Sequence, residues 1–304
     1  MMDILAFWIH FLIMCAETER FCMNKQETWP ARSNDRPFVR LVPDVQFARF
    51  AGGKTLSLNL LLPSGDGPAP LILWIVGGAW VSCNSARNLP QLVRLAERGY
   101  AVASIEYRLA HEARFPAQIE DVKSALRFLR ANADKYGIDS QRVGVWGHSA
   151  GGQLAALLGV TGGSSEFEAD EHLEQSTRVQ AVVDFSGPTD IALDFQSEYH
   201  MPVMALILGG TIGMKPDLAR RTNPVHYLDG REVPPFLIMH GDADTTVPLR
   251  QSQLLYDALT EAGVHSEFCV LEGTGHSTSE MLTRNDILDK VEDFFDRHLN
   301  FSKA

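Results

Sequence analysis

The sequence predicts an α/β protein: an eight-stranded, mostly parallel sheet with helices on both faces. From about residue 37 onward, short runs rich in Val, Ile, Leu and Phe alternate with helix-like runs, and Gly, Pro, Asn or Asp bounds them. Alternating units of this kind place parallel strands between two helical layers. The expected strands are 38–48, 55–62, 70–76, 100–107, 142–148, 179–186, 235–241 and 266–272, and the expected helices are 88–98, 117–136, 150–159, 249–262 and 279–298.

We expect one catalytic domain over 37–304, preceded by an N-terminal extension over 1–36. Two stretches interrupt the alternation. Residues 161–178 are rich in Gly, Ser and Glu, which favours a solvated loop. Residues 187–233 lie where a lid or pocket wall could be inserted, and their short apolar piece, 201–208, is equally compatible with a connecting helix.

The N-terminal extension has two interpretations, a signal-like segment or a helix that packs on the body. Residues 4–16 are apolar enough for a signal-peptide core but too short to span a bilayer. Asp3 opens the stretch, no Lys or Arg precedes it, and His10 interrupts it. These departures favour a cytoplasmic location slightly over secretion and leave the localisation open.

The composition of the chain argues against several classes of binding partner. The net charge is −11, from 27 basic and 38 acidic residues, which argues against nucleic acid and anionic membranes. The cysteines form no Cys-x-x-Cys pair, so free thiols and no zinc site are expected, although Cys15 and Cys22 could pair in an oxidising compartment. The sequence leaves open whether the protein forms a homodimer. The four cysteines are Cys15, Cys22, Cys83 and Cys269.

The Gly-His-Ser-Ala-Gly sequence at 147–151 identifies the candidate nucleophile, Ser149. An apolar strand, 142–148, leads into it, and a small-residue helix, 150–159, follows. A serine in such a strand–turn–helix setting sits on a sharp turn above the sheet, and glycines on either side permit the turn and close packing.

A serine needs a base, and the base needs a carboxylate that orients it. In serine hydrolases built on such sheets these follow the serine in the order Asp, His. Two acids, Asp242 and Asp244, follow the strand at 235–241; the sequence favours Asp244 as the orienting acid and Asp242 as a support of the loop. His276, in a glycine-flanked loop between the last strand and the last helix, is the candidate base.

The loop after the third strand, 76–80, supplies a candidate oxyanion hole. The amide of Ala150, next after the nucleophile, is one expected donor. The amides of Gly78 and Ala79 are the others, because small residues let the backbone approach a substrate. Trp80, at the end of this loop, is the expected substrate contact.

Together these residues resemble the α/β-hydrolase superfamily, within it the hormone-sensitive-lipase-like esterases, and most of all the bacterial feruloyl and acetylxylan esterase-like (BD-FAE) branch. The resemblance covers roughly 38–298. It is carried by the motifs at 76–80, 107–109, 115–117, 147–152, 240–248 and 275–276. It implies an α/β-hydrolase fold and a hydrolase of carboxylic esters with no metal and no organic cofactor.

One departure from the family pattern lies in the oxyanion loop. Val76 stands where the family has histidine, and Ala79 stands where it has a third glycine. Histidine can brace the loop with hydrogen bonds, and valine cannot. We therefore expect a working but less rigid oxyanion hole.

The predicted function is a serine carboxylesterase, acting through an acyl-enzyme on short-chain or aromatic acyl esters of acetyl or feruloyl type. Its substrate would be a small-molecule ester or one linked to a polysaccharide. One alternative is a serine peptidase of prolyl-oligopeptidase type, although 304 residues leave no room for its gating domain. The other is a ligand-binding homologue without catalysis, a reading that the retained serine, acid and histidine disfavour.

Overall fold

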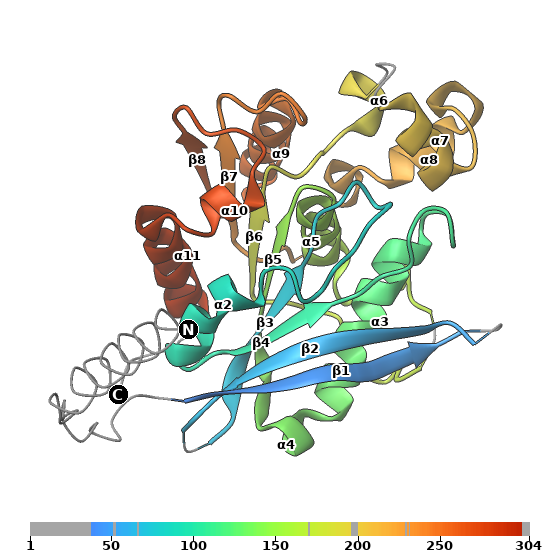
Figure 1. The fold of residues 1–304 in the computed structure, drawn as a ribbon. Coiled ribbons are helices and arrows are strands. Elements are labelled where there is room, and N and C mark those ends of the chain that lie inside the picture. The colour runs from blue at the N-terminus through green and yellow to red at the C-terminus, as the bar shows by residue number, and fades with distance from the viewer. Residues whose placement is uncertain are drawn as a thin grey trace, which may run out of the picture. The chain divides into compact units, whose positions relative to one another are not determined.

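The computed structural model describes residues 38–299 except 51–52, 66, 170, 196–199, 229 and 231 (Figure 1). The segment expected to act as a signal or a packing helix, within 1–36, lies outside the described residues, and so do Cys15 and Cys22. Cys83 and Cys269 are free thiols.

A single eight-stranded sheet forms the centre of the fold, in the order β1-β2-β4-β3-β5-β6-β7-β8. The pairs β1–β2 and β2–β4 are antiparallel, and every other neighbouring pair is parallel. The predicted fold class is thus confirmed. The strands are β1 (Val39–Arg49), β2 (Thr55–Pro63), β3 (Ala69–Ile75), β4 (Ala101–Ile105), β5 (Ile138–His148), β6 (Ala181–Phe185), β7 (Phe236–Gly241) and β8 (Ser266–Leu271).

Helices cover both faces of the sheet (Figure 1). None of the helices in the described part of the chain is long and apolar enough to cross a lipid bilayer. One face carries α2 (Leu89–Glu97), α10 (Thr278–Met281) and α11 (Asn285–His298), and the other carries α3 (Ala117–Ala131), α5 (Ala150–Thr161) and α9 (Arg250–Glu261), with the short α4 (Ala133–Tyr136) after α3.

The alternation of side chains along β3 shows why the sheet is filled from both sides. Leu73 and Ile75 pack into the core under α3 and α5, while Ile72 and Trp74 pack into the core under α2 and α11. Successive side chains of a strand point to opposite faces, so a continuous apolar run fits a central strand covered by helices on both sides.

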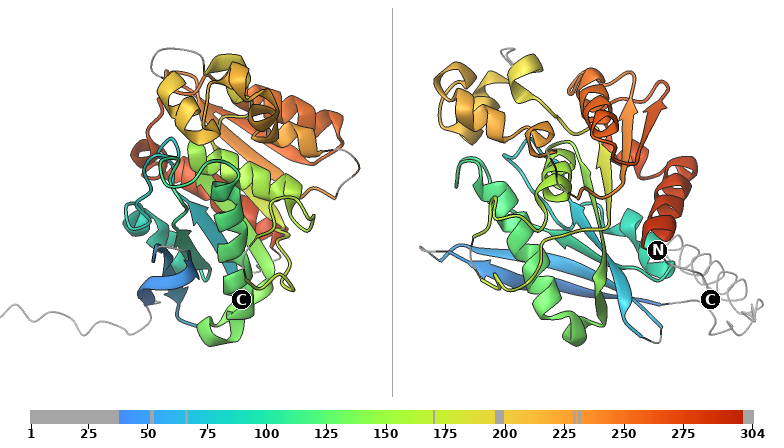
Figure 2. Two further views of the ribbon diagram at one scale, coloured as in Figure 1. Left: turned by 90° about the vertical axis from the view of Figure 1, so that its right-hand side faces the viewer. Right: turned by 180° about the vertical axis from the view of Figure 1, so that it is seen from behind.

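The insertion at 187–233 follows β6 and forms a group of short helices (Figure 2). The apolar piece expected at 201–208 is a helix, α7. Gln153 of α5 donates from Nε2 to the carbonyl oxygen of Thr222, 3.0 Å away, and so ties the insertion to the central layer. The helices are α6 (Ile191–Asp194), α7 (Met201–Leu208), η1 (Ile212–Met214), α8 (Pro216–Arg221) and η2 (Pro224–Tyr227).

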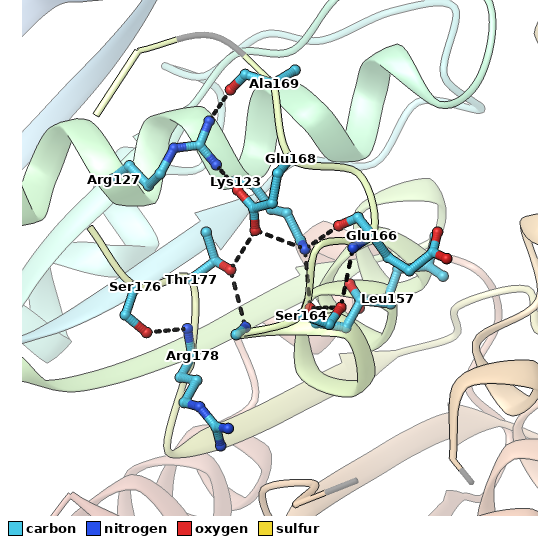
Figure 3. Close-up of polar contacts among 12 residues, drawn as sticks. Lys123, Arg127, Leu157, Ser164, Glu166, Glu168, Ala169, Ser176, Thr177 and Arg178 are labelled. Carbon is cyan, nitrogen blue, oxygen red and sulfur yellow. Dashed lines mark hydrogen bonds and ion pairs between the residues drawn. The ribbon is translucent and has the colours of Figure 1, made fainter. Parts of the chain in front are cut away.

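The loop at 161–178 is mostly exposed or half-buried, as its composition predicts, but ion pairs and hydrogen bonds attach it to α3. Two fully buried cations on α3, Lys123 and Arg127, form ion pairs with Glu168 (Figure 3). Lys123 also donates to the carbonyl oxygen of Thr161 at 3.0 Å, and Thr177 donates to Glu168 at 2.9 Å. Buried cations need such partners, and the loop is held down because it supplies them.

We predict that Glu168→Ala lowers the free energy of unfolding by about 2–3 kcal/mol, because two buried cations lose their carboxylate. The figure lies below the usual cost for a fully buried pair, since Glu168 is 24% exposed. Urea unfolding followed by circular dichroism measures the change. Glu174→Ala is the matched control on the same loop, and an equal loss in both variants would contradict the prediction.

Candidate active site

The turn between β5 and α5 holds Ser149 in a backbone conformation that few non-glycine residues adopt, with φ 56° and ψ −124°. Its amide donates to the carbonyl oxygen of Phe185 on β6, 2.8 Å away. A Cβ atom at Gly147 would lie 2.1 Å from the carbonyl oxygen of Gly151, and one at Gly151 would lie 2.1 Å from that of Ile75. The two glycines are therefore required because helix and strands approach within van der Waals contact of their backbones.

The structure brings Ser149, His276 and Asp244 together in a chain of hydrogen bonds. Nε2 of His276 lies 2.8 Å from Oγ of Ser149, and Nδ1 of His276 lies 2.6 Å from Oδ2 of Asp244. The three residues follow β5, β8 and β7, which end at the same edge of the sheet. A carboxylate only accepts hydrogen bonds, so Nδ1 carries the proton and Nε2 is free to accept from the serine hydroxyl.

Burial and four hydrogen-bond donors determine the charge of Asp244. Burial alone would raise its pKa, but hydrogen bonds from His240 and His276 and from the amide of Val247 outweigh burial and hold the pKa well below its ordinary value. Oδ1 accepts from the amides of Thr246 at 2.8 Å and Val247 at 2.9 Å. Asp244 is thus an anion at neutral pH.

His240 is a second partner of Asp244 that the sequence did not reveal. Its Nε2 lies 3.2 Å from Oδ2 of Asp244 and 2.9 Å from the carbonyl oxygen of Val247, and its Nδ1 lies 2.7 Å from the hydroxyl of Ser252. Asp242 does not reach the histidine chain and accepts from the amide of Gly273 at 2.7 Å. This is the loop-supporting contact that the sequence favoured for it.

The loop between β3 and α2 presents backbone donors beside Ser149. Gly78 and Ala79 have positive φ, 146° and 49°, and both line the cavity at the serine. Within the described chain, the amides of Gly78, Ala79 and Ala150 donate to no other group. Ala150 is also the first residue of α5, where the helix dipole adds positive potential.

A tyrosine supports this loop, although Val76 stands where the family has histidine and a less rigid loop was expected. The hydroxyl of Tyr107 is buried and donates to the carbonyl oxygen of Val76 at 2.9 Å. The side chain of Val76 packs with the apolar residues under α2. The loop therefore has a hydrogen-bonded brace despite the valine, although the brace acts on the main chain.

Trp80 does not line the cavity at Ser149, unlike the other expected site residues of this loop. Its side chain is 4% exposed and packs in the core that faces α3 and α5. The indole Nε1 donates to Oε1 of Gln153 at 3.1 Å, the same residue that holds Thr222. The sequence shows that an aromatic residue follows the loop, but it does not show that the indole donates to the buried Gln153.

Ser149 opens into a cavity of about 460 Å³. His148 also lines it; Nδ1 of His148 lies 2.6 Å from the hydroxyl of Thr278, and its ring lies 4.8 Å from that of His276. Burial, with the neighbouring ring of His276 as a smaller cause, lowers the pKa of His148 to about 3. Across the described part of the chain, no three His, Cys, Asp or Glu side chains are grouped as metal ligands.

A serine at the turn after β5, with histidine and aspartate beyond the last two strands of a mostly parallel sheet, defines an α/β-hydrolase. The BD-FAE family model matches residues 58–259, which is well over half of the chain. The chain belongs to the BD-FAE family.

Its relatives are esterases. Esterase LipC of Mycobacterium tuberculosis is 35% identical over 69% of this chain and 53% of its own length. This chain spans about half the length of the curated relatives it matches.

Solved structures agree with the fold. A truncated carbohydrate esterase from gut microbiota is 31% identical, with a TM-score of 0.76 over 88% of this chain and 99% of its own. The esterase Est2 of Thermogutta terrifontis is 25% identical, with a TM-score of 0.68 over 86% of this chain and 92% of its own. Est2 has also been solved with propionate or butyrate bound and after phosphorylation by paraoxon.

We predict that Gly151→Ala lowers the free energy of unfolding by about 1–3 kcal/mol or more, because the new methyl group meets the backbone of β3. Urea unfolding midpoints measure it. Gly213→Ala is the control, since a methyl group there meets no atom within 4 Å and its φ is not left-handed. Equal stability of the two variants would show that α5 can move away from the strand.

Proposed function

We propose that the protein is a serine carboxylesterase that hydrolyses short-chain or aromatic acyl esters, of acetyl or feruloyl type, through an acyl-enzyme. The observation that carries the proposal is the chain of hydrogen bonds from Ser149 through His276 to Asp244. No metal and no organic cofactor takes part in the reaction we propose.

In the first half-reaction, Oγ of Ser149 attacks the ester carbonyl carbon while Nε2 of His276 takes the hydroxyl proton. Negative charge develops on the carbonyl oxygen. The unused amides of Gly78, Ala79 and Ala150 are the donors we assign to that oxygen, and preorganised donors of this kind stabilise the transition state. Asp244 holds the imidazole in the required tautomer and stabilises the imidazolium.

When the tetrahedral intermediate collapses, the bond from carbon to the alcohol oxygen breaks and His276 returns its proton to that oxygen. The alcohol leaves and the acyl group stays on Ser149. Water then attacks the acyl-enzyme with His276 again as the base, and the same steps in reverse order release the acid and restore the serine hydroxyl.

The relatives favour a small acyl group. Est2 binds propionate and butyrate, which are short acids of the kind that such an esterase releases. The gut carbohydrate esterase supports a sugar-linked ester as the substrate. We therefore expect hydrolysis to be fastest on acetate to butyrate esters, with methyl ferulate as the aromatic substrate to compare.

We predict that Ser149→Ala lowers kcat on p-nitrophenyl acetate by about 10⁶-fold and that Asp244→Asn lowers it by about 10⁴-fold. Initial rates on p-nitrophenyl esters from acetate to decanoate, and on methyl ferulate, measure both effects. Ser140→Ala, at the other end of β5, is the control and keeps full activity. Labelling by a fluorophosphonate that survives in Ser149→Ala would contradict the assignment of the nucleophile.

We predict that Tyr107→Phe lowers kcat by about tenfold with a smaller change in KM. The variant leaves the carbonyl of Val76 without its donor, and a looser loop should cost less than the 10²–10³-fold loss of one oxyanion donor. Steady-state kinetics on p-nitrophenyl acetate measure the split. Tyr256→Phe is the matched control on α9. An unchanged kcat in Tyr107→Phe would mean that the brace has no part in turnover.

A further inference from the structure

The cavity at Ser149 has the loop that carries His276 as one of its walls. His276 must protonate the leaving oxygen, so the alcohol part of the ester has to lie against the loop that carries His276. That loop forms one wall of the cavity with Ser277, Thr278 and Ser279. The cavity is therefore the binding site for the leaving alcohol in the proposed reaction.

Arg87 lines this cavity together with Ser149 and His276. Its side chain is exposed, and within the described residues the guanidinium has no hydrogen bond and no ion pair. No Asp or Glu is among the residues that line the cavity. The positive charge of Arg87 also contributes to the lowered pKa of His148, so it acts within the cavity. In a protein of net charge −11, the described structure thus leaves Arg87 without an ion-pair partner in the cavity that holds Ser149.

Asn88, next to Arg87 in the chain, lines the same cavity. Its side chain, on a residue 2% exposed, makes no hydrogen bond to any described residue, and it does not cap α2. His148 also lines the cavity, but its Nδ1 lies 2.6 Å from the hydroxyl of Thr278 and its Nε2 is shielded from solvent, so the ring adds no free donor to the cavity. The Asn88 amide is therefore available, with the guanidinium of Arg87, to a polar group in the cavity.

We propose that Arg87, with Asn88 next to it in the chain, forms a subsite for a carboxylate on the leaving alcohol, so that the enzyme prefers esters whose alcohol part is anionic. The inference rests on the proposed esterase function and deepens it. A guanidinium offers several N–H groups in a planar fork that matches a carboxylate, and the Asn88 amide adds a neutral donor.

The preference is for the alcohol and not for the acid. Once the alcohol has left, its carboxylate leaves with it, and the acyl-enzyme carries no charge near Arg87. The subsite should therefore change the rate of acylation, which kcat/KM reports, and leave hydrolysis of the acyl-enzyme unchanged. Because Arg87 is exposed, added salt should weaken the preference.

The test compares two acetate esters that differ in one charge, 4-acetoxybenzoate and methyl 4-acetoxybenzoate. Both release acetate, and both leaving phenols are followed by ultraviolet absorbance. The quantity measured is the ratio of kcat/KM for the anionic ester to that for the neutral one. Measuring the ratio in wild type and in Arg87→Gln, Arg87→Lys and Arg87→Glu removes the intrinsic difference in reactivity between the two esters.

We expect the ratio to fall by about tenfold in Arg87→Gln and further in Arg87→Glu, to fall less in Arg87→Lys, and to fall in wild type when salt is added. Arg40→Gln is the control of equal charge change, because Arg40 lines a different cavity at the start of β3. A ratio that is unchanged in Arg87→Gln, or that changes equally in Arg40→Gln, overturns the subsite. If the wild-type protein hydrolyses neither ester, the proposed esterase function itself is contradicted.

Discussion

The approach of α5 to the ends of β3 and β5 is the constraint on which the site depends. Gly147 and Gly151 leave no room for a Cβ atom at this crossing, and Ser149 is held at a left-handed φ between them. The strained turn fixes the serine oxygen above the sheet without a side-chain hydrogen bond from the helix. Every other group at the site is placed relative to this oxygen, because the sheet positions the loops after β3, β7 and β8 around it.

Electrostatics then assigns different tasks to chemically similar groups. Three histidines lie close to one carboxylate. His276 reaches Ser149, His240 is buried with both ring nitrogens engaged, and His148 is kept neutral by burial. Asp244 accepts from two of these rings and from backbone amides. Because Asp244 accepts so many hydrogen bonds, it stays ionised, and its negative charge can stabilise an imidazolium that forms beside it.

Much of this could be predicted from the sequence, because strand and helix periods and the Gly-x-Ser-x-Gly turn are local patterns. All eight expected strands occur within a few residues of their predicted bounds, and Ser149, Asp244 and His276 meet as their order along the chain suggested. The brace from Tyr107 could not be predicted, since its acceptor is a main-chain oxygen 31 residues away.

The attachment of the loop at 161–178 to α3 could not be predicted for a related reason. Its composition is polar, but its partners are two cations on α3 whose burial only the folded chain reveals.

Because β8 lies at the edge of the sheet, the site can lose its geometry at a temperature at which the rest of the fold is still intact. Among the described strands, β8 pairs with β7 alone, and most of its side chains are only partly covered. Edge elements open at lower free energy than central ones, and the loop that carries His276 leaves from this strand. Fraying of the edge would displace His276 while β3, β5 and the serine turn stay intact. Heating would therefore first produce molecules that are reversibly inactive but not globally unfolded, which calorimetry does not register. The rate of amide hydrogen exchange at β8 would then follow the loss of activity.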